Sequence, residues 1–146
     1  MYTIDMMLSK GYQIIIKNNL LSDIDGEIKK VYQNKNVYIT GITGYKGGWL
    51  ALMLHHLGAN VYGIGLEPSQ EESLYYQAEI DEIAKVTIGD ITLSAPETKL
   101  IPSILLANPD YIFHLAETSE KAGYESPYET FQTNIMGTVA LHEIIR

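Results

Sequence analysis

The feature that most constrains this chain is a run of three glycines, spaced G-x-x-G-x-x-G over residues 41–47. A short β-branched run precedes it and a helical pattern of apolar residues follows it. At such a strand-to-helix turn, Gly41 can take the backbone angles of a tight turn. Gly44 lets a phosphate approach the backbone, and Gly47 lets the helix lie close on the strand. The helix would begin with unpaired N–H groups and a partial positive charge, so the loop predicts a pyrophosphate site.

The flanking pattern matters, because a glycine triplet alone can equally mark an ordinary turn. The remaining candidate binding residues of the loop are Thr43, Tyr45 and Lys46. Lys46 can contact a phosphate, or it can be a solvated loop lysine.

Strand-like and helix-like patterns alternate along most of the chain. Strands are expected at residues 37–40, 61–66, 86–88 and 111–115, and helices at residues 49–57, 73–80, 97–106 (bent at Pro102) and 127–145. Strands separated by helices pair in parallel through right-handed crossovers. The predicted fold is therefore an α/β, Rossmann-type parallel sheet in the order 3-2-1-4, with helices on both faces and incomplete at the C-terminus.

The first 35 residues differ in character from the rest. Residues 1–35 are expected to form an N-terminal extension that is partly helical, because Ile24, Ile28, Val31 and Tyr32 recur at helical spacing. Residues 36–146 carry the alternating pattern and the glycine loop, and are expected to form a dinucleotide-binding half-domain. A length of 146 residues fits one compact domain rather than two.

Composition excludes several classes of function. The net charge is −8 and Arg146 is the only arginine, which argues against a nucleic-acid surface. An acidic protein must instead hold a phosphate through backbone N–H groups. Cysteine is absent, which excludes disulfides and thiolate metal sites, and no metal site is expected. No apolar run is long enough for a signal or membrane segment, so we expect no membrane partner and a cytoplasmic protein.

Acidic residues follow the second and third expected strands. Glu67 lies 20 positions beyond Gly47, the spacing of the acid that binds the adenosine ribose in dinucleotide sites. A carboxylate there accepts hydrogen bonds from the ribose hydroxyls and repels a 2′-phosphate, so the predicted cofactor is NAD rather than NADP. The alternative reading of Glu67 is a solvated loop acid. Asp90 can reach the adenine amino group, with Ile91 as a wall of the ring, or can equally be an acid at a helix N-terminus.

Further motifs follow the glycine loop in a characteristic order. They are Gly89-Asp90-Ile91, Phe113-His114-Leu115-Ala116 and Thr133-Asn134-Ile135-Met136-Gly137-Thr138. Over about residues 36–146 the chain resembles the extended short-chain dehydrogenase/reductases, the NAD-dependent sugar-nucleotide epimerases and dehydratases. Within that family, three segments are similar to those of the CDP-glucose 4,6-dehydratase group: residues 40–50, 65–68 and 126–131.

The resemblance implies a role for each matching position. The loop glycines would hold the pyrophosphate, and Glu67, where the family usually has Asp, would hold the ribose. Asp90 and Ile91 would flank the adenine. Leu115 and Ala116 would line the path toward the nicotinamide, and Asn134 would lie in the helix beneath the active site.

The resemblance also implies a reaction. Enzymes of this group use NAD to oxidise a nucleotide sugar at C4, eliminate water across C5 and C6, and return the hydride to C6. The family's catalytic pair is Tyr-x-x-x-Lys, yet none of the 11 tyrosines has a lysine four residues on. No residue of this chain is therefore expected to be catalytic, and the chain by itself is expected to be inactive.

Two other residues need separate comment. Glu117 stands where the family usually has a second alanine, and a carboxylate near a pyrophosphate is unfavourable unless it points away. His114 lies within an apolar strand and is expected to be a hydrogen-bonded core histidine rather than a catalyst.

Three hypotheses stay open from sequence. The chain is the NAD-binding portion of a sugar-nucleotide 4,6-dehydratase or of a related epimerase, a stand-alone NAD or adenine-nucleotide binding module, or a remnant that binds nothing. In the first case its partner is a nucleotide sugar. The unpaired edge of an incomplete sheet also favours a homo-oligomer or aggregation.

Overall fold

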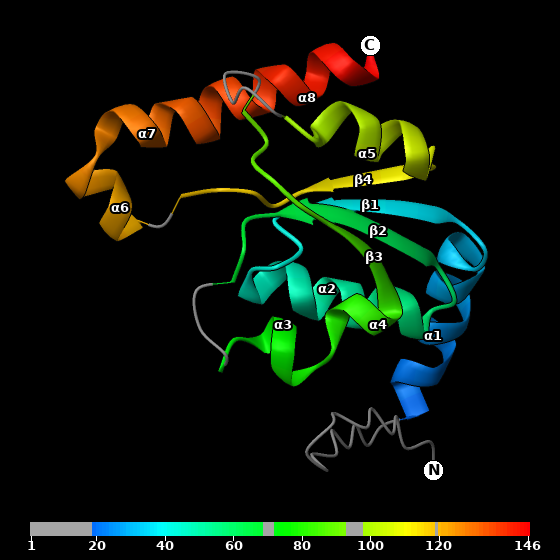
Figure 1. Ribbon diagram of the computed structural model, residues 1–146. Helices are drawn as coiled ribbons and strands as arrows, with labels where there is room; N and C mark the ends of the chain where they lie inside the picture. The colour runs from blue at the N-terminus through cyan, green and yellow to red at the C-terminus, as the bar shows by residue number, and fades with distance from the viewer. Residues whose placement is uncertain (1–18, 69–71, 93–97, 119) are drawn as a thin grey trace.

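Four parallel strands form the centre of the protein (Figure 1). The computed structural model describes residues 19–68, 72–92, 98–118 and 120–146. The strands are β1 (Asn36–Thr40), β2 (Asn60–Gly65), β3 (Ala84–Ile88) and β4 (Tyr111–His114). They lie in the order β3-β2-β1-β4, so the predicted Rossmann-type topology is confirmed.

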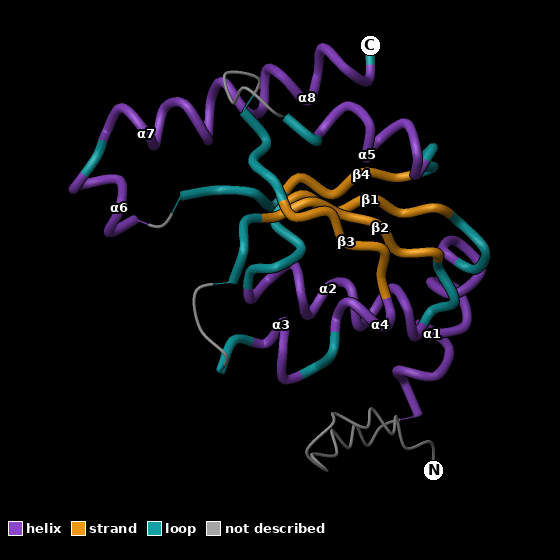
Figure 2. Tube along the Cα trace, viewed as in Figure 1, coloured by secondary structure: helices purple, strands orange, loops and turns teal. Residues whose placement is uncertain are grey.

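Helices cover both faces of this sheet, as Figure 2 shows. Below the sheet in that view lie α1 (Asn19–Tyr32), α2 (Tyr45–His56), α3 (Leu74–Gln77) and α4 (Ile80–Ile83). Above it lie α5 (Leu100–Ala107) and α8 (Thr138–Ile145). The chain reaches α8 through α6 (Glu120–Glu125), α7 (Pro127–Phe131) and a π-helical segment, Gln132–Gly137. In Figure 1, α6 and α7 project beyond the carboxyl ends of the strands.

Successive residues of β1 pack into different layers, because side chains alternate across a strand. Val37 and Ile39 are fully buried against α2, in a core that includes Leu54. Tyr38 is fully buried on the opposite face, in a core built with α5 and α8. Burial on both faces explains why β1 reads as a continuous apolar run.

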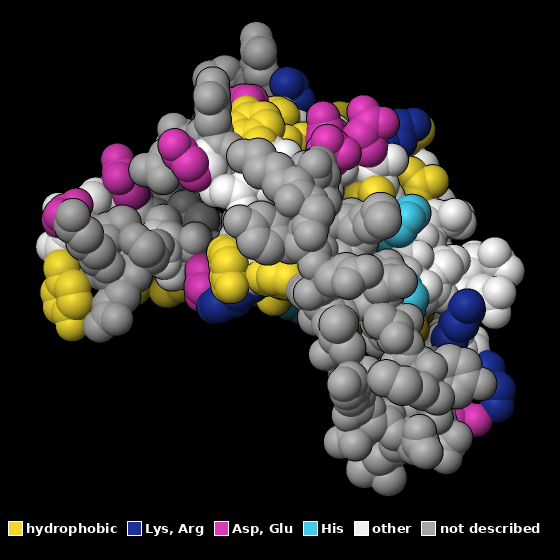
Figure 3. All heavy atoms as spheres, turned by 90° about the horizontal axis from the view of Figure 1, so that it is seen from below, with side chains coloured by type: hydrophobic (Ala, Val, Ile, Leu, Met, Phe, Trp, Pro, Cys, Tyr) yellow, Lys and Arg dark blue, Asp and Glu magenta, His cyan; other side chains and the backbone are white. Residues whose placement is uncertain are grey.

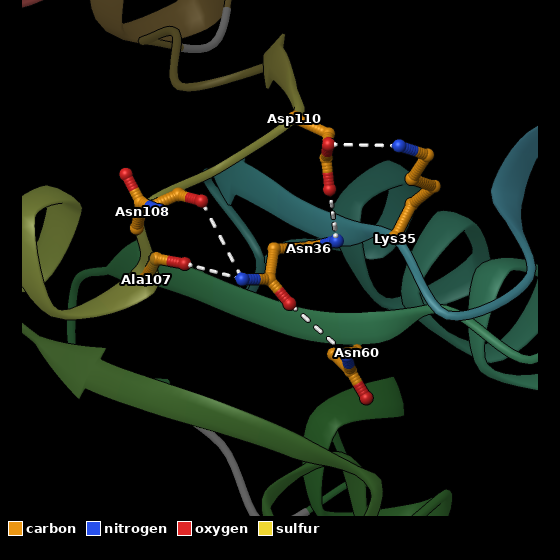
Figure 4. Close-up of polar contacts among 6 residues, drawn as sticks. All are labelled: Lys35, Asn36, Asn60, Ala107, Asn108 and Asp110. Atoms are coloured by element: carbon orange, nitrogen blue, oxygen red, sulfur yellow. Dashed lines mark hydrogen bonds and ion pairs between the residues drawn. The ribbon is translucent and has the colours of Figure 1, made fainter.

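A polar cluster joins the elements at the end of the sheet where the strands begin (Figure 4). The Asn36 side-chain amide donates to the carbonyl of Ala107 at 3.0 Å, and its oxygen accepts from Asn60 Nδ2 at 3.0 Å. The Asp110 carboxylate accepts from the Asn36 N–H at 2.8 Å and from Lys35 Nζ at 3.0 Å. These contacts tie β1, β2, α5 and β4 together far from the glycine loop.

Three expected helices differ from the prediction. The helix expected at residues 73–80 is two short helices, because Glu79 takes a left-handed conformation with φ 50° between them. The helix expected at residues 97–106 begins at Leu100, which places Pro102 in the first turn. A proline there removes no intrahelical hydrogen bond, and the helix continues through Pro102 without a break. Residues 93–97 lie outside the described part.

The helix expected at residues 127–145 is also not uniform. It begins after Ser126 as predicted, but its middle turn is the π-helical segment. The Thr138 hydroxyl donates to the carbonyl of Asn134 at 2.7 Å within this region. A π-helical turn inserts one extra residue per turn and re-aims the side chains on either side of it. Helix α6, which precedes it, was not predicted at all.

Candidate functional site

The glycine loop turns between β1 and α2 as its spacing predicts. Gly41 has φ 74°, a conformation that side chains other than glycine rarely adopt, and a Cβ there would lie 2.9 Å from the Ala116 nitrogen. A Cβ at Gly47 would lie 2.1 Å from the Gly41 carbonyl oxygen. The first glycine therefore lets the loop pass against the segment after β4, and the third lets α2 pack on the loop.

The first turn of α2 has backbone N–H groups without hydrogen-bond partners. Its N-cap residue, Gly44, provides no side-chain capping bond, and the N–H groups of the first turn have no intrahelical acceptor. The Gly48 N–H is the first to pair, with the Gly44 carbonyl at 2.8 Å. A side chain at Gly44 would meet only the Gly41 oxygen, at 3.3 Å. The free N–H groups of residues 45–47 and the open space over Gly44 suit an anion.

A cavity of about 440 Å³ lies at this point, at the carboxyl ends of the strands. Its lining brings together most of the sequence candidates, namely Gly41, Thr43, Gly44, Tyr45, Lys46, Gly47, Asp90, Ile91, Leu115 and Ala116. The lining residues that the sequence did not suggest as binding residues are Gly65, Leu66, Gly89, Thr118 and Thr133, together with Glu117, which was expected only to disfavour a nearby pyrophosphate. Several of these follow a strand directly, and the rule that ligands bind at the carboxyl ends of parallel strands could have identified them.

The end of the cavity near β3 is apolar with one carboxylate. Ile91 is buried, and Leu66 is exposed at the cavity wall. The Asp90 carboxylate accepts a hydrogen bond from the Thr92 N–H at 2.9 Å, which fixes the turn after β3. This arrangement leaves the second Asp90 oxygen available to a ligand and provides an apolar wall beside it.

Glu67 is not part of the cavity lining. Its exposed carboxylate accepts a hydrogen bond from the Tyr76 hydroxyl at 3.1 Å, which ties the loop after β2 to α3. Tyr76 also stacks edge-on against Tyr75, whose ring is buried. Glu67 thus lies next to the cavity residue Leu66, with its carboxylate engaged outside the cavity.

An ion pair joins two of the residues that line the cavity. Lys46 Nζ donates to Glu117 Oε1 at 2.7 Å, and the side chains are 73% and 60% exposed. The hydrogen bond and charge of Lys46 hold the pKa of the Glu117 carboxyl below its usual range. Glu117, the residue that departs from the family pattern, is therefore held by a lysine of the phosphate loop.

A second cavity of about 250 Å³ adjoins the first. The two share Lys46, Leu115, Ala116 and Glu117, and Asn134 lines only the second. The Asn134 side-chain oxygen accepts from the Thr118 N–H at 2.9 Å. Asn134 therefore connects the π-helical segment to the loop after β4, beside the shared wall.

His114 lies at the centre of a directional hydrogen-bond network. Because the Thr138 hydroxyl donates to Asn134, its oxygen must accept from His114 Nε2, at 2.9 Å. His114 Nδ1 then accepts from the Thr40 hydroxyl at 2.6 Å. The Thr40 oxygen in turn accepts from the N–H groups of Leu115 and Ala116, both at 3.1 Å. These bonds select the neutral Nε2–H tautomer.

Burial and the nearby His142 both lower the pKa of His114, in agreement with the neutral form. A proton on Nδ1 would face an oxygen whose two lone pairs are already used. His114 is thus a half-buried, hydrogen-bonded histidine, and through Thr40 it positions the backbone N–H groups of Leu115 and Ala116, which line both cavities.

In the space-filling view of Figure 3, the basic side chains drawn in colour are dispersed among acidic ones on the face shown. Among the described residues, no cluster of three or more histidine or acidic side chains could hold a metal ion. Within the same residues, no helix has both the length and the apolar character needed to cross a membrane.

Comparisons with known proteins agree with this architecture. A profile of the GDP-mannose 4,6 dehydratase family matches residues 38–146. CDP-glucose 4,6-dehydratase of Salmonella typhimurium is 39% identical over 119 residues, which are 81% of this chain and 32% of that protein. The chain spans between a fifth and a third of the length of these curated relatives, at 32%, 20% and 31% of the first three.

Solved structures share the fold. An epimerase of Methanothermobacter thermautotrophicus superposes with a TM-score of 0.69 at 24% identity, over 83% of this chain and 34% of that one. A UDP-glucose-4-epimerase from Stenotrophomonas maltophila, solved with bound NAD, superposes with a TM-score of 0.62 at 23% identity, over 77% and 33%. At these identities the likeness establishes the fold alone.

Proposed function

This chain belongs to the GDP-mannose 4,6 dehydratase family, and from that premise we propose that the cavity at its glycine loop binds the ADP part of NAD. The observation that carries the proposal is the open N-terminus of α2 beneath a loop of closely packed glycines. In an acidic chain, unpaired N–H groups are the means of holding a pyrophosphate. The structural relative with bound NAD supports the choice of cofactor.

The residues present fit an adenine dinucleotide. The pyrophosphate would lie over Gly44, against the N–H groups at the start of α2. The adenine would lie at the apolar end beside Ile91, with Asp90 available to its amino group. Glu67 would hold the ribose only after its carboxylate turns from Tyr76 toward the cavity. When bound, NAD supplies a hydride acceptor, and this chain's own residues bind and orient it.

We further propose that the chain represents the cofactor-binding part of a sugar-nucleotide 4,6-dehydratase that acts on a CDP-hexose. The 39% identity to a CDP-glucose 4,6-dehydratase supports this substrate class, and a nucleotide sugar is then the partner of the whole enzyme. In this proposal residues 36–146 are the binding domain and residues 1–35 an extension. A cytoplasmic location belongs to the same proposal, consistent with a sequence that has no cysteine.

A stand-alone binding module is the second candidate. It is favoured by one observation: residues of this chain alone form the phosphate loop and its cavity. Both candidates require nucleotide binding, and they differ in whether the chain supports turnover when it is joined to a substrate-binding part.

Calorimetric titration of the chain with NAD, ADP-ribose and adenosine tests the binding proposal. We expect ADP-ribose to bind about as tightly as NAD, because the contacts identified lie at the ADP half. Adenosine should bind more weakly, because it lacks the pyrophosphate. Absence of heat for all three ligands would overturn the proposal.

A further inference from the structure

The cavity at the glycine loop is lined by more acidic than basic side chains. Of the described residues in that lining, Lys46 alone carries positive charge, and Asp90 and Glu117 carry negative charge. The Asp90 carboxylate is held at the turn after β3 by the Thr92 N–H. Glu117 is the acid in contact with Lys46, which is the one cationic side chain among the described residues that line this cavity.

The two partners come from separate elements. Lys46 is the second residue of α2, next to the unpaired N–H groups, and Glu117 follows the end of β4. Their contact closes a loop of 71 residues and lies on the wall that both cavities share. The Glu117 carboxylate thus neutralises the charge of Lys46 beside the N–H groups to which an anionic ligand would bind.

We propose that Glu117 is an internal counter-anion of the nucleotide site, which a ligand phosphate must displace from Lys46 in order to bind. Glu117 then sets the affinity of the site for anionic ligands without contacting the adenine end. This inference rests on the proposed function, because the displacing anion is the pyrophosphate of an adenine dinucleotide.

Displacement of Glu117 from Lys46 by the ligand phosphate can be distinguished from a model in which Glu117 only repels the phosphate. If Lys46 leaves Glu117 to bind the phosphate, the ligand gains the lysine contact but loses the ion pair. Removal of Glu117 should therefore increase the contribution of Lys46 to the free energy of ligand binding. If the two side chains act independently, this contribution is the same with and without Glu117, so a double-mutant cycle separates the two cases.

The experiment is calorimetric titration of the 146-residue chain and of E117Q, K46Q and the double variant with ADP-ribose. E117Q should bind about two- to fivefold more tightly at low salt, the range that an exposed ion pair of this kind accounts for. The gain should shrink as salt screens the charges. The loss of affinity caused by K46Q should be larger in the E117Q background than in the unmodified chain.

Two controls accompany the cycle. Adenosine, which carries no phosphate, should bind all four proteins equally. E82Q removes one exposed carboxylate from α4, outside the cavity lining, and should leave ADP-ribose affinity unchanged.

Equal or weaker ADP-ribose binding by E117Q, or an equal effect of K46Q in both backgrounds, would overturn the inference while leaving the proposed function intact. Failure of every one of these proteins to bind either ligand would overturn both.

Discussion

At the scale of single residues, the phosphate loop depends on how closely its backbone approaches itself. We predict that Gly47→Ala abolishes ADP-ribose binding, because the added Cβ would lie 2.1 Å from the Gly41 carbonyl and force the loop apart. Such overpacking costs about 1–3 kcal/mol of stability. Chemical denaturation and calorimetry together measure both effects.

Gly26→Ala is the matched control for that substitution. Gly26 lies in α1, and a Cβ there has nothing within 4 Å. Because alanine is the better helix former, this variant should be stabilised by about 0.5–1 kcal/mol and bind normally. A Gly47 variant that binds as well as the Gly26 variant would contradict the role assigned to the loop.

The specificity expected of Glu67 is a second prediction at this scale. If its carboxylate turns from Tyr76 to the ribose on binding, Glu67→Ala should lower the affinity for NAD and reduce the preference for NAD over NADP. Titration with both cofactors measures the ratio. Glu72→Ala changes a neighbouring exposed acid and should leave the ratio unchanged. Equal affinity of the unmodified chain for NAD and NADP would remove the role given to Glu67.

At the scale of elements, the amino end of the sheet depends on one asparagine. The Asn36 side chain bonds to Ala107 at the end of α5 and to Asn60 on β2. Asn36→Ala should destabilise the chain by about 1–3 kcal/mol, because partners are left unpaired in a part-buried site. Asn60→Ala removes only the bond between the two side chains, so its effect on the free energy of unfolding should be smaller. Equal losses would show that the contact with α5 contributes nothing.

The His114 network gives the junction of β1, β4 and the π-helical segment a pH dependence. The pKa of His114 is lowered in the folded chain, so His114 takes up a proton in the unfolded chain first as pH falls. Stability should therefore be full above about pH 6.5 and decrease as pH falls from there to the folded pKa. Asp110 and Glu117, whose pKa values are also lowered, add a separate loss below about pH 4.

His114→Asn tests this assignment, since asparagine offers a donor and an acceptor but does not titrate. The variant should lose the pH dependence near pH 6 and keep the acid loss. Nitrogen NMR of the unmodified chain should find His114 protonated on Nε2 at neutral pH. The Nδ1–H tautomer would contradict the network.

At the scale of the whole molecule, we expect this chain to bind a nucleotide without catalysing a reaction. The sequence contains no Tyr-x-x-x-Lys, so we predict that the purified chain forms no 4-keto-6-deoxy sugar from CDP-glucose in the presence of NAD. The assay is the absorbance of the keto product in base, with a full-length CDP-glucose 4,6-dehydratase as control. Turnover by the chain alone would show that other residues perform the chemistry.

The edges of the sheet bear on assembly at the same scale. In the described structure β4 pairs only with β1, and α7 exposes Tyr128 and Phe131, at 76% and 61%. Unpaired strand edges and exposed aromatic side chains favour association. A homo-oligomer stays a prediction, which sedimentation at several concentrations would test.

Local pattern by itself determined the architecture. The β-α alternation predicted a parallel sheet in the order β3-β2-β1-β4, because handed crossovers leave few other arrangements. The glycine spacing located the turn at β1, and the carboxyl ends of the strands then had to meet beside it. Candidates as distant as Gly41, Asp90 and Leu115 therefore line one cavity.

Only the tertiary structure decided how the side chains are used. The pairing of Lys46 with Glu117 joins residues 71 positions apart, and the engagement of Glu67 by Tyr76 depends on where α3 packs. The break at Glu79 and the π-helical turn around Asn134 are likewise set by neighbouring elements. Periodicity reports which face of an element is apolar, but side-chain rotamers and long-range partners are chosen only when the elements pack together.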